Sequence, residues 1–404
     1  MKKIIFITNS FPFGLAEKSF ITPEFNVLKE KFDITIVSRN AKDVQTTECA
    51  ENISIYRYDS QDKYNAFKLF LLSMIRKELY VEWSRCILRK KNDKRNMIKI
   101  LKMMMRSIHF SEFLKKVRGA ISNNSVIFYT YWNDYATYAC TKVKNKSDKI
   151  ISRIHGADLY LERSNGYQMY KHVMNSRIDA LHFISKEGLE YYKKNYGNDV
   201  RRMSVSYLGV KKSNNLIKVN DSDELNLLSV SSCLEVKRLD LLIEALSTIK
   251  DIKVRWIHIG DGPEYERLRK KADNLLKNNI QFEFKGHMKN SDIIPYIVCQ
   301  SFDFLINVSY SEGLPVTMME AMSCGLPVIA GDVGGISEIV ESEKNGYLFP
   351  KNIDSLTLGE FIKKCAELSV EEKGKLSAHA YRTWESKFCD EKNFAKFIKE
   401  IEEI

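Results

Sequence analysis

The sequence predicts an α/β protein built from two doubly wound parallel-sheet, Rossmann-like domains that face each other across a cleft. Short β-rich runs alternate with helical stretches along the chain, which is the signature of parallel sheets. A length of 404 residues suits two or three domains of about 150 residues each. A polar, non-periodic stretch at 210–224 separates the runs into two series.

The first series contains short runs rich in β-branched and aromatic residues, which we interpret as strands. They are Lys3–Thr8, Asp33–Ser38, Ser125–Tyr131, Lys149–Ile154, Ala180–Ile184 and Met203–Tyr207. The opening of the chain resembles a signal peptide, but its apolar run is short and no small-residue cleavage site follows. We therefore expect a buried first strand there.

The second series combines strand candidates with helices that carry apolar residues at i, i+3 and i+4. The strands are Leu225–Ser231, Val254–Ile259, Ile280–Phe284, Phe302–Asn307 and Pro327–Ala330, and the helices are Leu239–Ile249, Glu264–Leu276 and Val316–Ser323. We expect a first domain at 1–210, a linker at 211–224 and a second domain at 225–388. A charged amphipathic helix at 389–404 is expected to pack back on the first domain.

Composition excludes several classes of protein. With 44% hydrophobic and 28% charged residues, the chain is neither disordered nor of low complexity. Its most apolar stretch, Phe67–Ile75, is interrupted by Lys68 and is far shorter than the ~18 apolar residues of a membrane span. The eight cysteines form no C-x-x-C pair, so we expect reduced thiols and no structural metal. We expect a cytoplasmic protein.

The net charge of +11 is concentrated in one segment. Between Arg85 and Arg118, twelve Lys and Arg residues stand against Asp93 and Glu112, which leaves +10 within 34 residues. A local excess of this kind indicates a polyanionic partner, although a solvated charge run is the alternative. Nucleic acid is not expected, because no aromatic platform or nucleic-acid motif accompanies the charges.

We favour an anionic membrane surface for this basic segment. Its expected acceptor or membrane contacts are Arg89, Lys90, Lys91, Lys94 and Arg95. Residues Met103–Met105 with Ile98, Ile100, Leu101 and Ile108 are expected to form an apolar side next to the charges.

The strongest motif lies in Ser311–Ala330. A strand ends near Ser309, a glycine-containing turn follows, and a helix begins near Pro315, so free N–H groups and a helix N-terminus can meet an anion. Glu312 on the turn and Glu320 on the helix can face the same cleft. Without other information, a capping acid and a solvated helix glutamate are the more usual explanation of two such residues.

This block resembles the E-x7-E motif of the large family of retaining nucleotide-sugar glycosyltransferases, whose members have the GT-B fold. Gly334–Val340 and Asn345–Leu348 also resemble the family's sequence. The resemblance implies that Glu312 lies against the donor sugar and that Glu320 binds the ribose hydroxyls. The turn residues that it places at the donor are Gly313, Leu314 and Pro315.

A basic pair, Lys237 and Arg238, follows the strand and turn that begin the second series. Cations at a helix start can bind phosphate, although such pairs are also common on solvated surfaces. The segment resembles the family's Arg-x4-Lys phosphate grip, with Lys237 at the Lys position and Ser232 at the Arg position. We expect Arg238 to supply the missing charge.

Three further positions resemble the family's ligand loops. Gly260 and Gly262 form a strand-to-helix turn of the kind found on the nucleotide side, where Pro263 suits the first helical position. His155 ends a strand as the family's His-Gly does, which implies contact with the donor sugar, although a lone His is more often a packing residue. Gly14 remains from the family's first glycine-rich loop, Asn9–Phe20.

The resemblance implies a metal-independent, retaining hexosyltransferase-type enzyme with His155, Glu312 and Lys237 as catalytic residues. The expected donor is a nucleotide-sugar, a UDP-sugar in particular, with no other cofactor and no metal. The expected acceptor is a glycan or lipid-linked glycan of surface polysaccharide (capsule, O-antigen or exopolysaccharide) biosynthesis, at the inner face of the plasma membrane. A GT-B nucleotide-sugar epimerase and a non-catalytic partner subunit are the alternatives.

Overall fold

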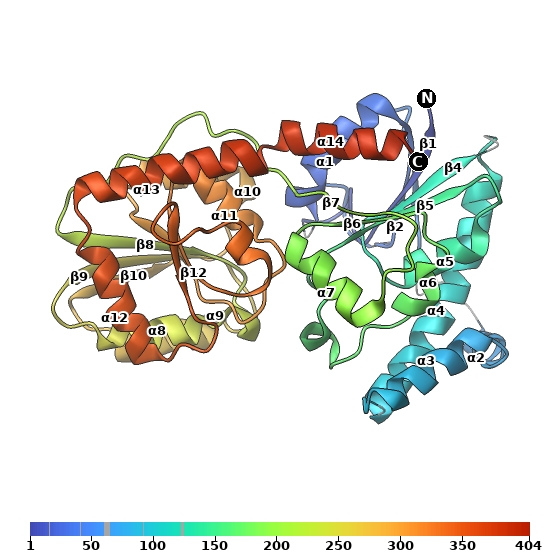
Figure 1. Cartoon of the computed structure of the whole chain (residues 1–404), viewed down its shortest axis with the longest axis horizontal. Coiled ribbons are helices and arrows are strands. Elements are labelled where there is room, and N and C mark those ends of the chain that lie inside the picture. Colours follow the sequence, from blue (N-terminus) through green and yellow to red (C-terminus); the bar gives the residue numbers. More distant parts are fainter. Residues whose placement is uncertain (16, 41, 60–64, 92, 123–124) are drawn as a thin grey trace. The chain divides into compact units, whose positions relative to one another are not determined.

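The computed structural model describes residues 1–15, 17–40, 42–59, 65–91, 93–122 and 125–404. The chain divides into two compact units (Figure 1). The first unit contains Met1–Tyr207 together with Phe394–Ile404, and the second contains Leu208–Asn393. Within the described residues, each unit is built on a single parallel β-sheet, so the fold class is the predicted α/β class.

The sheet of the first unit has the strand order β3-β2-β1-β4-β5-β6-β7. Its strands are β1 Lys3–Thr8, β2 Asp33–Ser38, β3 Ser54–Arg57, β4 Val126–Thr130, β5 Lys149–Ile154, β6 Ala180–Phe183 and β7 Met203–Val205. The apolar runs of β1 and β4 are buried on both faces, as is usual for the central strands of a parallel sheet. Successive residues of β1 alternate between the two faces: Ile4 and Phe6 join one core cluster, and Ile5 and Ile7 join the other.

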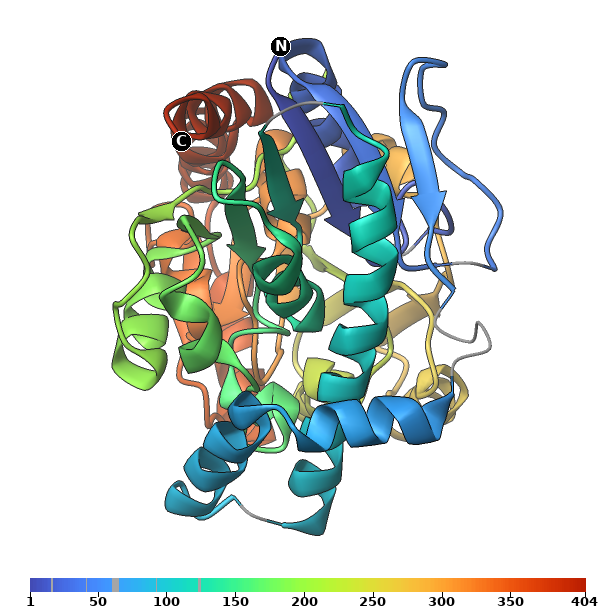
Figure 2. The same cartoon turned by 90° about the vertical axis from the view of Figure 1, so that its right-hand side faces the viewer.

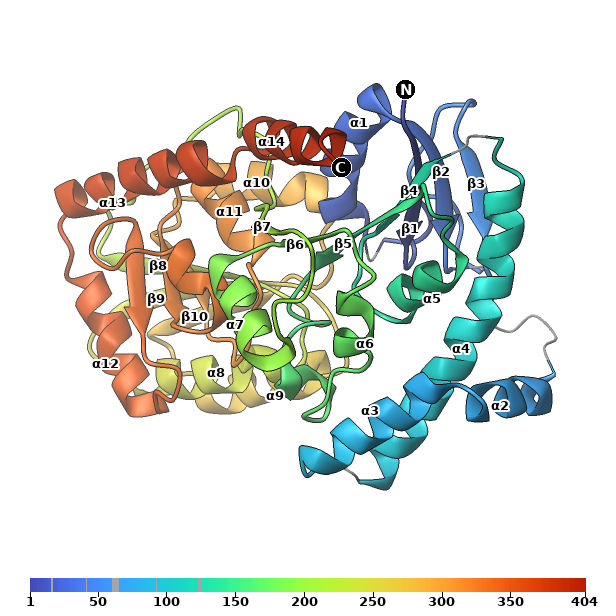
Figure 3. The same ribbon diagram turned by 45° about the vertical axis from the view of Figure 1, so that its right-hand side comes forward.

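Helices cover both faces of this sheet (Figure 3). One face is covered by α1 Lys18–Lys31 and α14 Asp390–Glu402. The α14 residues Phe397 and Ile401 are buried against this face of the sheet. The predicted C-terminal helix therefore packs on the sheet of the first unit. On the other face lie α4 Lys94–Gly119, α5 Tyr135–Val143, α6 Lys171–Asn175 and α7 Lys186–Tyr196. Two further helices, α2 Ala66–Met74 and α3 Lys77–Leu88, pack against α4 (Figure 2).

The sheet of the second unit has the strand order β10-β9-β8-β11-β12-β13. Its strands are β8 Glu224–Val230, β9 Lys253–Ile259, β10 Ile280–Phe284, β11 Phe304–Asn307, β12 Val328–Gly331 and β13 Gly346–Phe349. Its helices are α8 Leu239–Thr248, α9 Tyr265–Leu275, α10 Asn290–Cys299, α11 Val316–Ser323, α12 Ser355–Ala366 and α13 Val370–Thr383. The predicted strands and helices of this series are present, with bounds that differ by one or two residues.

The segment predicted as a linker, 211–224, has almost no regular structure and is held against the second unit. The Ile217 N–H donates to the carbonyl oxygen of Cys324 at 2.8 Å. The Asn220 amide donates to a carboxylate oxygen of Asp303, also at 2.8 Å. Both partners belong to the second unit, so most of this segment is fixed to it by hydrogen bonds.

The apolar side expected for the basic segment is present, but most of it is buried and does not face a partner. Ile100, Met104 and Ile108 of α4 are buried in the core of the first unit, where they pack beneath the sheet. Ile98, by contrast, is 43% exposed. The 3.6-residue period shows that α4 has an apolar stripe, but the presence of a sheet beside that stripe depends on the tertiary fold.

Candidate functional site

In each unit the strand order reverses at one point, and most of the donor-site residues singled out from the sequence lie on loops or helices next to these two points. The reversal lies between β1 and β4 in the first unit and between β8 and β11 in the second. The loops that follow neighbouring strands diverge there, so the carboxyl ends of the strands are left open to a ligand.

In the second unit, the structure brings Lys237 and Glu312 together. Lys237 ends the short 3-10 turn η2, Glu235–Lys237, after β8, and Glu312 follows β11. The Nζ of Lys237 lies 2.6 Å from Oε1 of Glu312, and the two side chains are 19% and 8% exposed. The Asn307 amide also donates to the same oxygen, at 3.4 Å. Lys237 and Asn307 line a small pocket with Ser229, Ser231, Ser309 and Thr317, and five apolar residues complete its lining.

Two of the three guanidinium nitrogens of Arg238 donate hydrogen bonds to backbone carbonyl oxygens. It has a left-handed conformation, φ +48°, between η2 and α8. Its Nε donates to the carbonyl oxygen of Val308 at 2.8 Å, and its Nη1 donates to that of Lys351 at 3.0 Å. Its Nη2 is buried and has no hydrogen-bond partner among the described residues. Arg238 therefore holds the end of β11 to the loop that contains Lys351.

Glu320 has a partner of its own. It lies on α11, is 4% exposed, and accepts a hydrogen bond from Nδ2 of Asn290 at 2.9 Å. Burial raises the pKa of Glu320 to about 7, and the Asn290 bond opposes that shift only in part. Near neutral pH this carboxyl group changes between an acceptor and a donor of hydrogen bonds.

The turn between β11 and α11 is held by backbone contacts. The Gly335 N–H donates to the carbonyl oxygen of Gly313 at 2.9 Å, Leu314 is buried, and Pro315 caps α11. Pro315 has no N–H to leave unsatisfied, which suits the start of a helix.

The two glycines after β9 allow the close approach of two loops. A Cβ on Gly260 would lie 1.8 Å from the carbonyl oxygen of Ser231, and one on Gly262 would lie 2.7 Å from that of Cys233. Both residues have positive φ, +146° and +152°. They fit the loop after β9 against the loop that leads to Lys237.

In the first unit, His155 follows β5 and is packed between aromatic rings. The ring centroids of Tyr131 and Trp132 lie 4.8 and 4.7 Å from that of His155. Burial lowers the pKa of His155 to about 3, with Arg153 adding to the shift, so the imidazole is neutral. Its Nε2 is buried and lacks a hydrogen-bond partner within the part of the chain that the structure describes.

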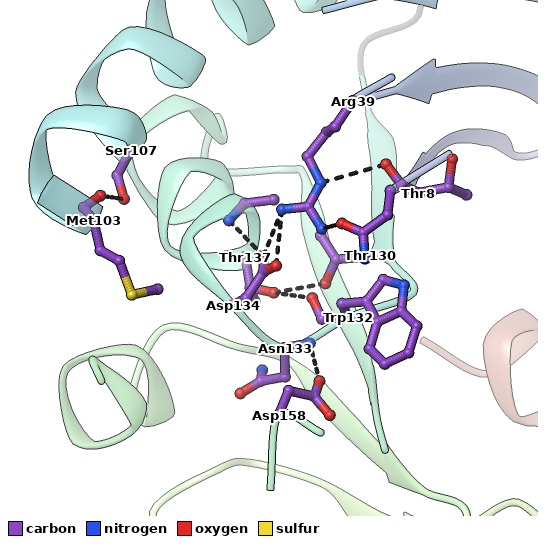
Figure 4. A network of polar contacts seen from close by, with 12 residues as sticks. Thr8, Arg39, Met103, Ser107, Thr130, Trp132, Asn133, Asp134, Thr137 and Asp158 are labelled. Atoms are coloured by element: carbon purple, nitrogen blue, oxygen red, sulfur yellow. Dashed lines mark hydrogen bonds and ion pairs between the residues drawn. The ribbon is translucent and has the colours of Figure 1, made fainter. Parts of the chain in front are cut away.

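A polar network surrounds the end of β4 (Figure 4). Asp158 accepts hydrogen bonds from the backbone N–H of Asn133 at 2.6 Å and of His155 at 2.7 Å. Lys171 donates to Oδ1 of Asn133 at 2.8 Å. Burial raises the pKa of Asp158 to about 6 and lowers that of Lys171 to about 8. The two groups attract each other, which limits both shifts.

This network borders a cavity of about 310 Å³. Trp132 contributes an aromatic surface, and Asp134, fixed by Arg39 at 2.8 Å, contributes a carboxylate. Met103 and Gln168 also line it. Three consecutive residues with polar groups after a buried strand, Trp132–Asp134, were the signal that sequence reasoning overlooked.

The first βα loop is organised by Glu17. Its carboxylate accepts the backbone N–H groups of Ser10 at 2.5 Å and of Phe11 at 2.9 Å. Gly14 has φ +64°, and a Cβ there would lie 2.6 Å from Oδ2 of Asp43. The predicted lining residue Gly14 thus has a local packing role, and Ala16 of this loop lies outside the described residues.

The predicted basic contacts lie at the corner between α3 and α4. Lys90, Lys91, Lys94 and Arg95 are exposed there, whereas Arg89 is half-buried and donates to the carbonyl oxygen of Asn195. Arg118, at the far end of the segment, is buried and paired with Asp148 at 2.9 Å. The charge of the segment is therefore only partly available to a partner.

The described residues contain neither a metal-binding cluster nor a membrane-spanning helix. No group of three or more His, Cys, Asp or Glu side chains is placed to hold a metal ion among them. In the same described residues, no helix has the length and apolar character needed to cross a bilayer.

These features define a class of protein. Two Rossmann-like parallel sheets, with polar groups gathered where their strand orders reverse, make this a GT-B fold. The Anabaena protein HepE, solved in complex with UDP and glucose, matches with a TM-score of 0.68 at 15% identity and covers 100% of both chains. At that identity the likeness shows the fold alone.

The sequence of the second unit is similar to that of one protein family. Residues 212–383 match the family described as Glycosyl transferases group 1. An uncharacterised glycosyltransferase of Methanocaldococcus jannaschii is 33% identical over 216 residues, 52% of this chain and 57% of that protein. The putative colanic acid biosynthesis glycosyltransferase WcaL of Escherichia coli is 29% identical over 160 residues, 37% of each chain. The matches thus span between about a third and a little over half of these relatives.

Proposed function

We propose that this protein is a glycosyltransferase that moves a sugar from a nucleotide diphosphate donor to an acceptor hydroxyl. The observation that carries the proposal is the Lys237–Glu312 ion pair at the strand reversal of the second unit, whose sequence matches the group 1 family. A cation held at the end of a parallel strand suits a diphosphate, and a carboxylate beside it suits sugar hydroxyls.

The donor in this proposal is a UDP-sugar. The likeness to HepE, whose solved complex holds UDP and glucose, supports this choice. Lys237 and the Nη2 group of Arg238 neutralise the diphosphate, and Glu320 accepts hydrogen bonds from the ribose. The cationic side chains take the part that a divalent ion has in other transferases.

The reaction in this proposal retains the configuration of the sugar. The acceptor hydroxyl attacks the anomeric carbon on the face from which the diphosphate leaves. The bond between that carbon and the phosphate oxygen breaks, a new carbon–oxygen bond forms, and the departing phosphate takes the acceptor proton. His155, neutral and with a free Nε2 among the described residues, contacts the donor sugar.

The acceptor is a glycan or a lipid-linked glycan of a surface polysaccharide. The printed name of WcaL, a colanic acid biosynthesis glycosyltransferase, supports that class. In the first unit, the cavity beside Trp132 and Asp158 has the aromatic face and fixed carboxylates that suit a sugar ring. A lipid-linked acceptor places the enzyme at the inner face of the plasma membrane.

The test is a screen of UDP-sugars by thermal shift, followed by transfer assays with the stabilising donor. A ligand at 100 times its Kd adds about 2.7 kcal/mol to stability. We expect one UDP-sugar to stabilise the protein and to yield an α-linked product from an α-linked donor. Turnover of the donor without any acceptor would instead identify an epimerase. Absence of both binding and turnover with every nucleotide-sugar would leave a non-catalytic subunit.

A further inference from the structure

The helix α2 turns its apolar side to solvent. Phe67, Phe70, Leu71 and Ile75 are 68%, 38%, 48% and 76% exposed. Their spacing is that of one face of a helix. On the other side of α2, Leu69 and Ser73 are buried. A surface helix usually buries its apolar face, whereas α2 exposes most of its apolar side chains to solvent.

The next helix, α3, repeats this arrangement. Its exposed apolar residues are Tyr80, Val81, Ile87 and Leu88, the last of which is 80% exposed. The Tyr80 hydroxyl donates to the carbonyl oxygen of Met74 at 2.6 Å and so ties α3 to α2. Both helices pack on α4, at the end of the first unit remote from β1 and β2 (Figures 2 and 3). We call residues 65–91 and 93–98, which include α2, α3 and the first turn of α4, the α2–α3 surface.

Basic residues accompany the exposed apolar ones. Those that are exposed are Lys68, Arg76, Lys77, Lys90, Lys91, Lys94 and Arg95. Glu78 and Glu82 are buried, where Glu78 pairs with Lys142 and Glu82 accepts from Tyr167 at 2.9 Å. Within residues 65–91 and 93–98, Asp93 is the one exposed acid, and it caps α4. The exposed charge of this surface is therefore strongly positive.

We propose that the α2–α3 surface docks on an anionic lipid bilayer. The apolar side chains enter the interfacial layer, and the basic groups contact the lipid phosphates. Interfacial helices have this composition, with Phe and Leu on one side and Lys and Arg on the other. This inference rests on the proposed transfer to a lipid-linked acceptor, and it replaces the expected apolar side of α4 with residues of α2 and α3.

A second copy of the chain fits this surface less well than a bilayer does. In a two-fold dimer the same patch meets itself, so two sets of uncompensated Lys and Arg side chains would come together. Protein interfaces are also poor in Lys. The phosphates of anionic lipids, by contrast, neutralise the Lys and Arg side chains, and the interfacial layer is an environment that suits the exposed apolar side chains.

The experiment measures sedimentation of the full chain with vesicles of phosphatidylglycerol and phosphatidylcholine in equal parts. Ile75→Ser/Leu88→Ser removes two of the most exposed apolar side chains. Leu356→Ser/Val370→Ser is the matched control, because Leu356 and Val370 are 68% and 51% exposed on α12 and α13 of the second unit. We expect the first variant to lose about tenfold in partitioning per side chain, and the control to match the parent.

A second variant separates charge from apolar contact. Lys90→Gln/Lys91→Gln/Lys94→Gln/Arg95→Gln should lose the preference for phosphatidylglycerol over pure phosphatidylcholine vesicles. Equal sedimentation of the parent and of both surface variants would overturn the proposal. So would a parent dimer in light scattering that Ile75→Ser/Leu88→Ser dissociates, because a second copy would then be the occupant.

Transfer to a short soluble acceptor, measured on the same variants, keeps the two proposals apart. Unchanged transfer with lost vesicle binding supports both. Unchanged transfer with unchanged vesicle binding in every variant rejects the docking surface alone. Vesicle binding by a parent that transfers no sugar rejects the function and leaves the docking surface standing.

Discussion

Glu320 is buried on α11 beside Asn290, and its pKa of about 7 makes the unliganded site sensitive to pH. Because the pKa is raised above the ordinary 4.5, the folded state holds the proton more tightly than the unfolded state does. The buried charge therefore destabilises the fold as pH rises from about 4.5 to about 7, by on the order of 3 kcal/mol.

We predict opposite effects of Glu320→Gln on stability and on donor binding. The variant should lose this pH dependence and unfold at higher temperature than the parent above pH 7. It should also bind UDP more weakly by about 1.5–3 kcal/mol there, because an amide accepts less strongly than a carboxylate. Calorimetric titration and thermal unfolding across this pH range measure both. Equal UDP affinity of the two proteins at every pH removes Glu320 from the donor site.

The structure shows that Lys237 forms an ion pair with Glu312, which its sequence motif did not indicate. We predict that Lys237→Ala lowers kcat more than it weakens donor binding, because the negative charge on the diphosphate grows in the transition state. Single-turnover rates and the Kd for UDP-sugar separate the two effects.

The control for Lys237 is Lys344→Ala, which breaks the exposed pair with Glu341. Such surface pairs contribute about 0–1 kcal/mol, so this variant should keep full activity. Lys237→Ala leaves the Glu312 carboxylate buried without the neighbouring cation. The double variant Lys237→Ala/Glu312→Gln removes that charge as well, so it should restore stability without restoring kcat. Equal losses in kcat and in donor affinity for Lys237→Ala would reduce Lys237 to a binding residue.

At the scale of elements, loop packing around β8 and β9 positions the charged groups. Gly260 sits where a Cβ would meet the carbonyl oxygen of Ser231, on the loop that leads to Lys237.

Two short edge strands, β3 and β13, were absent from the prediction. Each is four residues long and pairs on one side, so neither needs the long apolar run that marks a central strand.

We predict that Gly260→Ala destabilises the protein by several kcal/mol and weakens donor binding, since the backbone of one loop must move. Gly374→Ala is the matched control. Gly374 lies within α13, and apart from its chain neighbours and the backbone of that helix, no atom of the described residues lies within 4 Å of its added Cβ. That change should stabilise the helix by up to about 1 kcal/mol. Urea unfolding and UDP titration compare the two, and a Gly260→Ala protein as stable as the parent would contradict the predicted clash.

For the whole molecule, the proposal assigns charge neutralisation to side chains, so we predict that sugar transfer persists in EDTA. The rate should stay within about twofold of the untreated enzyme, because Lys237 and Arg238 supply the positive charge. A purified enzyme treated with EDTA and assayed with and without added Mg²⁺ or Mn²⁺ tests this. Loss of activity that either ion restores would contradict the whole assignment of the phosphate site.

The sequence by itself determined the α/β class, the division into two series, the motif that contains Glu312 and Glu320, and the separate basic pair that contains Lys237. Apolar runs, turn residues and helix periods are local properties, so they can be read along the chain. The pairing of Asn290 with Glu320 and of Lys171 with Asn133 needed the tertiary structure, because residues 30 and 38 positions apart meet only once the sheets form. The same holds for the basic segment. Periodicity marked the apolar stripe of α4, but only the folded chain shows that this stripe is buried and that α2 and α3 expose theirs.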